Sequence, residues 1–226
     1  MELVMFKQVN YNTWYLRVLG VFTRFFSLIH FNGFRALFNG GVYYSLKESD
    51  HDTLKKLLSS GYYVILTQRK SHLTTYLIGI LSYIKTRKWP KYTHVLMNVD
   101  TVEDPDQWNK FRLMEATNSG VHWSTFMQVF DCDAVAILAP LNPDWNWDKA
   151  VEALLKQNGL LYDDLFDIND TQRVSCVELI RNSLFSDPRY KEEFKEFEAS
   201  IAKVGNLTPQ MFRDCGDFRV VFEVSR

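Results

Sequence analysis

Short apolar runs, each bounded by turn-forming or polar residues, recur along this chain and limit the folds open to it. They lie at residues 62–67, 93–99, 111–117, 134–139 and 218–224. Runs of this length are typical of buried strands, and the last is rich in β-branched residues. Expected helices cluster between and after these runs instead of alternating with every strand. The pattern favours an α+β fold with an antiparallel sheet packed against helices.

Helical spacing and capping residues predict five helices in the same part of the chain. The first follows a cap at Ser49-Asp50 and stops before Gly61, and the fourth is capped by Asp170 or Thr171, with Cys176 in its first two turns. The fifth is rich in Lys and Glu and is expected to face solvent. The expected ranges are 49–59, 71–84, 146–157, from 170 or 171 to 184, and 188–204.

The first 47 residues differ in composition from the rest. No acidic residue occurs between Glu2 and Glu48, and aromatic residues are dense between positions 14 and 38. Arg17 and Arg24 interrupt the apolar run, so we expect an amphipathic helix and not a membrane span. This helix either packs on the following domain, which we favour, or lies on a membrane or virion surface. We therefore divide the chain into an aromatic, basic extension (1–47) and one domain (48–226).

Charge and cysteine content narrow the partners and the compartment. The formal net charge is −1, so no general attraction to nucleic acid is expected. The three cysteines form no disulfide framework, no CxxC pair is present, and no zinc-ligand spacing occurs. Residues 1–6 do not have the pattern of a secretory signal. We expect a protein of a reducing, cytoplasmic compartment that needs no metal.

Three residues could together carry nucleophilic chemistry. Cys176 lies near the start of an expected helix, where the helix dipole favours the thiolate form. His94 lies on an expected strand, and its imidazole could accept the thiol proton. Glu115 lies on the next expected strand. If the two strands pair, its carboxylate could orient the imidazole.

The segments around these residues resemble the permuted branch of the NlpC-type papain-like superfamily. The matching segments are 92–95 (Tyr-Thr-His-Val), 114–116 (Met-Glu-Ala), 162–163 (Tyr-Asp) and 175–179 (Ser-Cys-Val-Glu-Leu). In that branch the histidine strand comes first, the glutamate strand follows and the cysteine helix comes last. The resemblance covers residues 61–184, and it implies a circularly permuted papain-like fold for the domain 48–226.

The resemblance also implies an activity. It is the cleavage of an amide or ester, or acyl transfer, through an acyl-cysteine intermediate, and we expect cleavage of an amide. Cys176 would be the nucleophile, His94 the base and Glu115 its orienting partner. Tyr162 would contact the substrate or the oxyanion. No cofactor is implied, and the substrate would be a peptide, peptidoglycan or an acylated amine. Such proteins occur in bacteria, phages and large DNA viruses, so a virion location is the alternative to the cytoplasm.

Two other functions remain open at this point. The chain could be a phage virion protein that keeps the fold with a vestigial site, or an acyltransferase that works at a membrane surface. His72 and His122 could line a pocket, although we expect them to be ordinary surface or core residues. The basic segment 85–91 is expected to be a solvated loop that could touch an anionic ligand beside His94.

Overall fold

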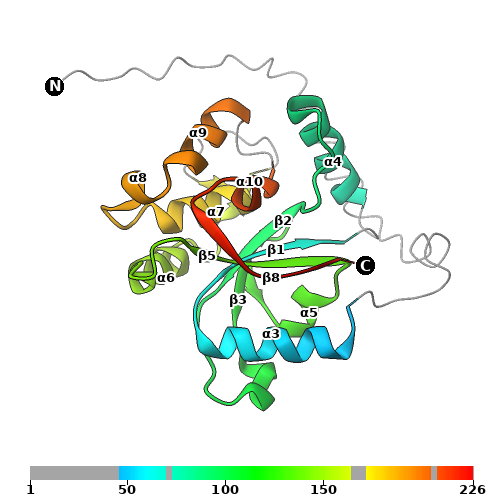
Figure 1. Ribbon diagram of the computed structural model, residues 1–226, viewed down its shortest axis with the longest axis vertical. Coiled ribbons are helices and arrows are strands. Elements are labelled where there is room, and N and C mark those ends of the chain that lie inside the picture. The colour runs from blue at the N-terminus through cyan, green and yellow to red at the C-terminus, as the bar shows by residue number, and fades with distance from the viewer. Residues whose placement is uncertain (1–45, 70–72, 164–171, 205–207, 226) are drawn as a thin grey trace.

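The computed structural model describes residues 46–69, 73–163, 172–204 and 208–225 (Figure 1). The expected N-terminal extension therefore lies outside the described residues except for its last two positions. In the described segments, no helix is long and apolar enough to cross a bilayer.

A six-stranded antiparallel sheet forms the centre of the fold, in the order β4-β3-β2-β1-β5-β8. Its strands are β1 (Val64–Gln68), β2 (His94–Asn98), β3 (Leu113–Thr117), β4 (Gly120–Ser124), β5 (Ala134–Pro140) and β8 (Phe218–Ser225). A separate parallel pair joins β6 (Leu161–Tyr162) to β7 (Arg173–Val174). The α+β class and the antiparallel sheet are confirmed.

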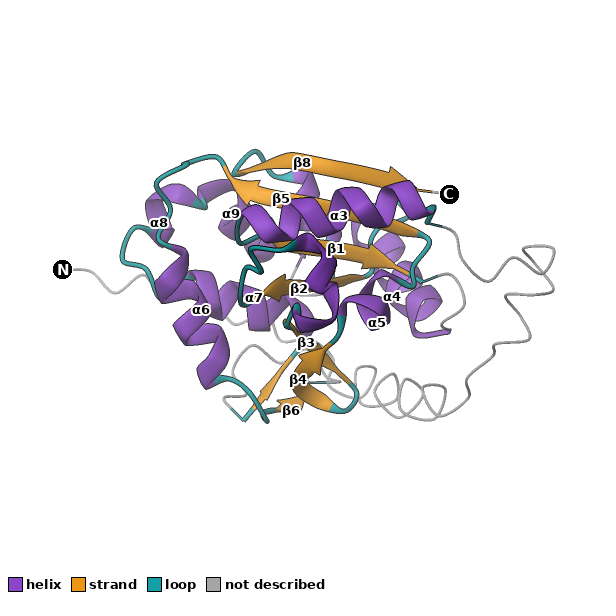
Figure 2. Ribbon diagram, turned by 90° about the horizontal axis from the view of Figure 1, so that it is seen from below, coloured by secondary structure: helices purple, strands orange, loops and turns teal. Residues whose placement is uncertain are grey.

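Helices cover both faces of this sheet (Figures 1 and 2). They are α3 (Glu48–Ser60), α4 (Leu73–Thr86), η1 (Pro105–Lys110), α5 (Phe126–Phe130), α6 (Trp147–Lys156), α7 (Cys176–Leu184), α8 (Tyr190–Glu193), α9 (Lys195–Val204) and α10 (Gln210–Asp214). One core lies between the sheet and α6, α7, α9 and α10, and a second lies under α3 and α5. Alternate residues of β1 enter the two cores, Val64 and Leu66 the first and Ile65 the second. A strand that is buried on both faces has a continuous apolar sequence, and this is why β1 could be predicted from the sequence.

One strand of the sheet was not expected from the sequence. β4 follows β3 through a tight turn, and Thr117 pairs with Gly120. Gly120 has φ +90°, a conformation that glycine adopts without strain. The Gly-Val-His-Trp-Ser sequence of β4 is not a continuous apolar run, because Trp123 is exposed and His122 is half-buried. Its assignment as a strand depends on its pairing with β3.

Two helix starts differ from the expectation. α3 begins at Glu48, because the Asp50 carboxylate accepts a hydrogen bond from the Lys47 backbone N–H at 2.9 Å. α7 begins at Cys176 and not at 170 or 171, and the short strand β7 precedes it. The expected cap at Asp170 or Thr171 lies outside the described residues.

The prediction of one solvent-facing helix over residues 188–204 is wrong in two respects. The segment forms two helices, α8 and α9, with a non-helical Phe194 between them (φ −121°, ψ 44°). Phe194 and Phe197 are also fully buried. The Phe194 ring packs against three aromatic rings. The distance between ring centroids is 4.9 Å to Trp145, 5.2 Å to Tyr190 and 5.0 Å to Phe218. This aromatic cluster attaches α8 and α9 to the first core.

The aromatic cluster predicts a large difference between two phenylalanines. Phe194→Ala should lower the free energy of unfolding by about 3–5 kcal/mol, because it leaves a cavity among packed rings. Phe185→Ala should cost roughly 1 kcal/mol or less, because half of that side chain is exposed. Urea unfolding followed by circular dichroism measures both. Equal losses for the two variants would contradict the burial of Phe194.

Candidate active site

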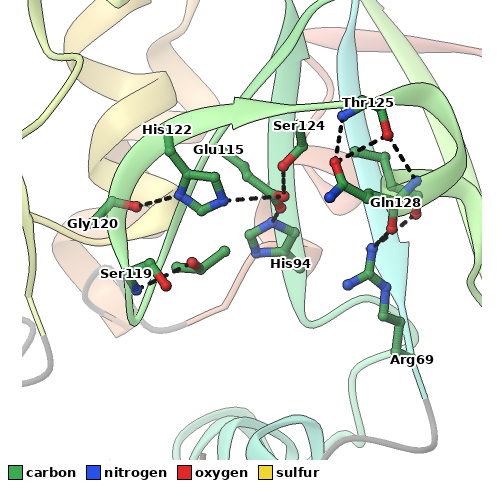
Figure 3. A network of polar contacts seen from close by, with 11 residues as sticks. Arg69, His94, Glu115, Ser119, Gly120, His122, Ser124, Thr125 and Gln128 are labelled. Atoms are coloured by element: carbon green, nitrogen blue, oxygen red, sulfur yellow. Dashed lines mark hydrogen bonds and ion pairs between the residues drawn. The ribbon is translucent and has the colours of Figure 1, made fainter. Parts of the chain in front are cut away.

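His94 and Glu115 meet on neighbouring strands. His94 is the first residue of β2, and Glu115 lies in the middle of β3, opposite Leu96. The distance from His94 Nε2 to Glu115 Oε2 is 2.5 Å (Figure 3). The carboxylate is 6% exposed and the imidazole 23% exposed. β2 and β3 pair, which is the condition on which the sequence-based hypothesis depended, and the pairing brings the two side chains into direct contact.

The second carboxylate oxygen of Glu115 is held by β4. Ser124 donates its hydroxyl hydrogen to Oε1, and His122 Nε2 lies 3.9 Å from the same oxygen (Figure 3). His122 is directly opposite Glu115 in the sheet, and its Nδ1 is 2.9 Å from the Gly120 carbonyl oxygen. Ser124 was not among the residues expected at the site, and His122 was expected to be an ordinary surface or core residue. The sequence signal for both residues is their spacing. His122 and Ser124 are two positions apart, so in a hairpin with the strand of Glu115 their side chains lie on the same face as Glu115.

These contacts keep the Glu115 carboxylate charged. Burial by itself raises its pKa, but hydrogen bonds from His94 and Ser124 and the positive charge of Arg69 outweigh burial. The pKa of Glu115 falls to about 2. The Glu115 carboxylate is therefore negatively charged near neutral pH, although it is buried.

Cys176 is the third residue of the candidate site. It is the first residue of α7, and α7 packs against β2 and β3. Its thiol lies close enough to His94 to raise the pKa of the imidazole. Because Glu115 occupies Nε2, Nδ1 is the ring nitrogen left for the thiol. Cys176 is 3% exposed, and all three cysteines are free.

A capping box fixes the start of α7. The Ser175 hydroxyl accepts a hydrogen bond from the Glu178 N–H at 3.3 Å, and the Glu178 carboxylate accepts one from the Ser175 N–H at 2.8 Å. Neither bond uses the N–H groups of Cys176 or Val177. The Ser-x-x-Glu pattern was present in the sequence and would have placed the cap at Ser175.

The pKa of His94 is shifted upward. Burial lowers it, but hydrogen bonds to Cys176 and Glu115 and the charge of Glu115 prevail and raise it to about 9. His94 therefore carries a proton near neutral pH, beside a cysteine sulfur. This is the arrangement that can supply a proton to a leaving group.

The remaining candidates are less closely tied to this group. Tyr162 is half-buried on β6, where it pairs with Val174, two residues before Cys176, and packs against the first core. His72 lies outside the described residues. Among the described residues, no group of three or more His, Cys, Asp or Glu side chains could hold a metal ion.

Comparisons of the chain with protein-family models, with curated proteins and with solved structures gave no match. The functional assignment therefore depends on the site itself.

The pKa shifts predict a window of pH for the stabilising effect of the pair. The pKa of His94 lies above its ordinary 6.5, so its contribution is complete below pH 6.5 and is lost as the pH rises through about 9. The pKa of Glu115 lies below its ordinary 4.5, so its contribution is complete above pH 4.5 and is lost as the pH falls through about 2. Glu115→Gln should therefore destabilise the protein most between pH 4.5 and 6.5, by about 1.5–3 kcal/mol.

Urea unfolding of both proteins across the pH range measures this effect, and the difference should shrink toward pH 9. Glu152→Gln is the matched control, because Glu152 is an exposed carboxylate paired with Lys156. A Glu115→Gln effect that stayed constant from pH 5 to pH 9 would show that the His94–Glu115 charge pair is not its source.

Proposed function

We propose that this protein is a cysteine hydrolase with a circularly permuted papain-like, NlpC-type fold. The observation that carries the proposal is the 2.5 Å contact of the His94 imidazole with the Glu115 carboxylate, together with the Cys176 thiol, which lies close enough to raise the pKa of the same imidazole. The order of these residues along the chain supports the permuted arrangement. So does the position of Cys176 at the first residue of a helix that packs on the strands of the other two.

The first half of the proposed reaction is acylation. The Cys176 sulfur, having given its proton to His94, attacks the carbonyl carbon of an amide and forms a C–S bond. The carbonyl oxygen becomes an oxyanion, which the N–H groups of Cys176 and Val177 can receive because the capping box does not use them. The C–N bond then breaks, and the amine leaves with the proton from His94.

The second half is hydrolysis. A water molecule gives one proton to His94 and attacks the acyl carbon, the C–S bond breaks, and a carboxylic acid is released. Glu115 remains charged throughout and holds the imidazole so that Nδ1 faces the sulfur. Ser124 fixes the carboxylate from the other side. We assign Tyr162 a contact with the substrate or the oxyanion, since it lies close before the cysteine helix.

The proposed substrate is an amide: a peptide, a peptidoglycan stem peptide or an acylated amine. The contrasting function is a virion protein with a vestigial site. The two functions differ in whether the thiol reacts, since a vestigial site has no need for an activated sulfur.

Selective labelling of the cysteines distinguishes the hydrolase from the virion protein with a vestigial site. Brief treatment with iodoacetamide at about pH 6–7 should modify Cys176 before Cys215, although Cys176 is the less exposed at 3% against 7%. Cys215 should be slow because burial raises the pKa of its thiol to about 12. Peptide mapping by mass spectrometry measures the rate at each cysteine.

His94→Ala is the control for this labelling. It removes the proton acceptor, so labelling of Cys176 should slow while that of Cys215 stays the same. If Cys215 or Cys132 reacted first in the native protein, exposure and not activation would govern the thiols, and the proposed nucleophile would be wrong.

A simple ester tests turnover without knowledge of the natural substrate. p-Nitrophenyl acetate should release a burst of p-nitrophenolate and leave one acetyl group on the peptide that contains Cys176. Cys176→Ala should abolish the burst, and His94→Ala should slow it by about 10²- to 10⁴-fold. Glu115→Gln should slow it less, because Glu115 only orients the ring. An unchanged burst in His94→Ala would refute the assignment of the base.

A further inference from the structure

The helix α4 carries an exposed apolar face. Tyr76, Ile80, Tyr83 and Ile84 expose 45%, 47%, 48% and 52% of their surface. Their spacing of four, three and one places them on one side of a helix. In Figure 1, α4 lies at the rim of the molecule, beyond the ends of the strands. Large apolar side chains gathered in this way mark an interaction surface more often than scattered ones do.

Among the α4 side chains that the structure describes, the buried ones are small. Thr75, Gly79 and Ser82 are buried, and the Thr75 hydroxyl lies 3.5 Å from that of Thr93. An ordinary surface helix turns its apolar face inward and its polar face outward. In the described residues of α4 this pattern is inverted, so the four exposed apolar side chains lie away from the protein's own core.

A basic loop with an exposed tryptophan continues this surface. Trp89 is 51% exposed and lies over Gly79, where an added Cβ would come within 2.6 Å of its ring. Arg87 and Lys88 are exposed beside it. The sequence contains no acidic residue from position 53 to position 99. At the end of the loop, Lys91 pairs with Glu223 at 2.9 Å.

We propose that the face made by Tyr76, Ile80, Tyr83, Ile84 and Trp89 docks on an anionic lipid surface, with Arg87 and Lys88 against the headgroups. Tyrosine and tryptophan favour the boundary between headgroups and acyl chains, and basic side chains bind anionic lipids. A second copy of the chain fits less well, because two such surfaces would bring basic loops of the same sign together.

The helix that carries this face packs next to the candidate active site through its buried side. Thr93, which contacts Thr75 of α4, directly precedes His94. Docking would hold the His94 end of β2 near the bilayer, where a substrate with an acyl chain would be presented. This choice of an acylated substrate rests on the proposed function, whereas the docking itself does not.

Vesicle binding of the full-length chain tests the proposal. The protein should float with vesicles of equal parts phosphatidylcholine and phosphatidylglycerol and much less with phosphatidylcholine alone. Two variants should each weaken binding about tenfold or more, Ile80→Ser with Ile84→Ser, and Arg87→Glu with Lys88→Glu. All four side chains are exposed, so both variants should keep the native melting temperature.

Matched controls change exposed residues elsewhere. Leu141→Ser with Leu155→Ser, and Lys195→Glu with Lys203→Glu, should bind vesicles like the native protein. Cys176→Ala should also bind normally, which separates docking from the proposed activity. No binding to the anionic vesicles, equal losses in the controls, or full binding by the α4 variants would overturn the proposal. A change of oligomeric state in the α4 variants, without vesicle binding by the native protein, would assign the face to self-association instead.

Discussion

The buried carboxylate of Glu115 is the constraint on which the candidate site depends. A charge taken out of water is costly unless it is paired and hydrogen-bonded, and here the partners come from the two strands that flank β3. A shift of β3 by one residue would turn Glu115 into the first core, among Met114 and Ala116, and would remove both partners. The pairing of this one charge therefore ties the register of three strands to the geometry of the site.

The cysteine helix is fixed by a different interaction. The capping box of Ser175 and Glu178 sets the first residue of α7, while Leu179 and Ile180 bury its apolar side in the first core. Cys176 is therefore placed by contacts that also stabilise the fold. The thiol stays near His94 without the need for an attraction between these two side chains, because the packing of the helix on the sheet already holds both residues in place.

Aromatic residues serve two separate purposes in this molecule. Phe194, Phe197, Phe212 and Phe218 pack ring against ring and hold the C-terminal helices on the sheet. Tyr76, Tyr83 and Trp89 lie on the outer side of α4 or on the loop that follows it. The first group stabilises the protein through burial, and the second leaves apolar surface available to a partner, in our proposal a membrane.

The sequence by itself determined the α+β class and the positions of five strands, because strands buried on both faces appear as continuous apolar runs. It also singled out His94, Glu115 and Cys176 as residues to be considered together, although their roles remain proposals. Only the tertiary structure decided that β4 is a strand, that Ser124 and His122 contact Glu115, that Phe194 is buried, and that the apolar side of α4 faces outward. The first two depend on the pairing of β4 with β3 in a hairpin, the third on contacts between segments distant in the sequence, and the fourth on which side of a helix stays exposed. A local pattern of residue types specifies what a segment can form, but not which segment will cover it.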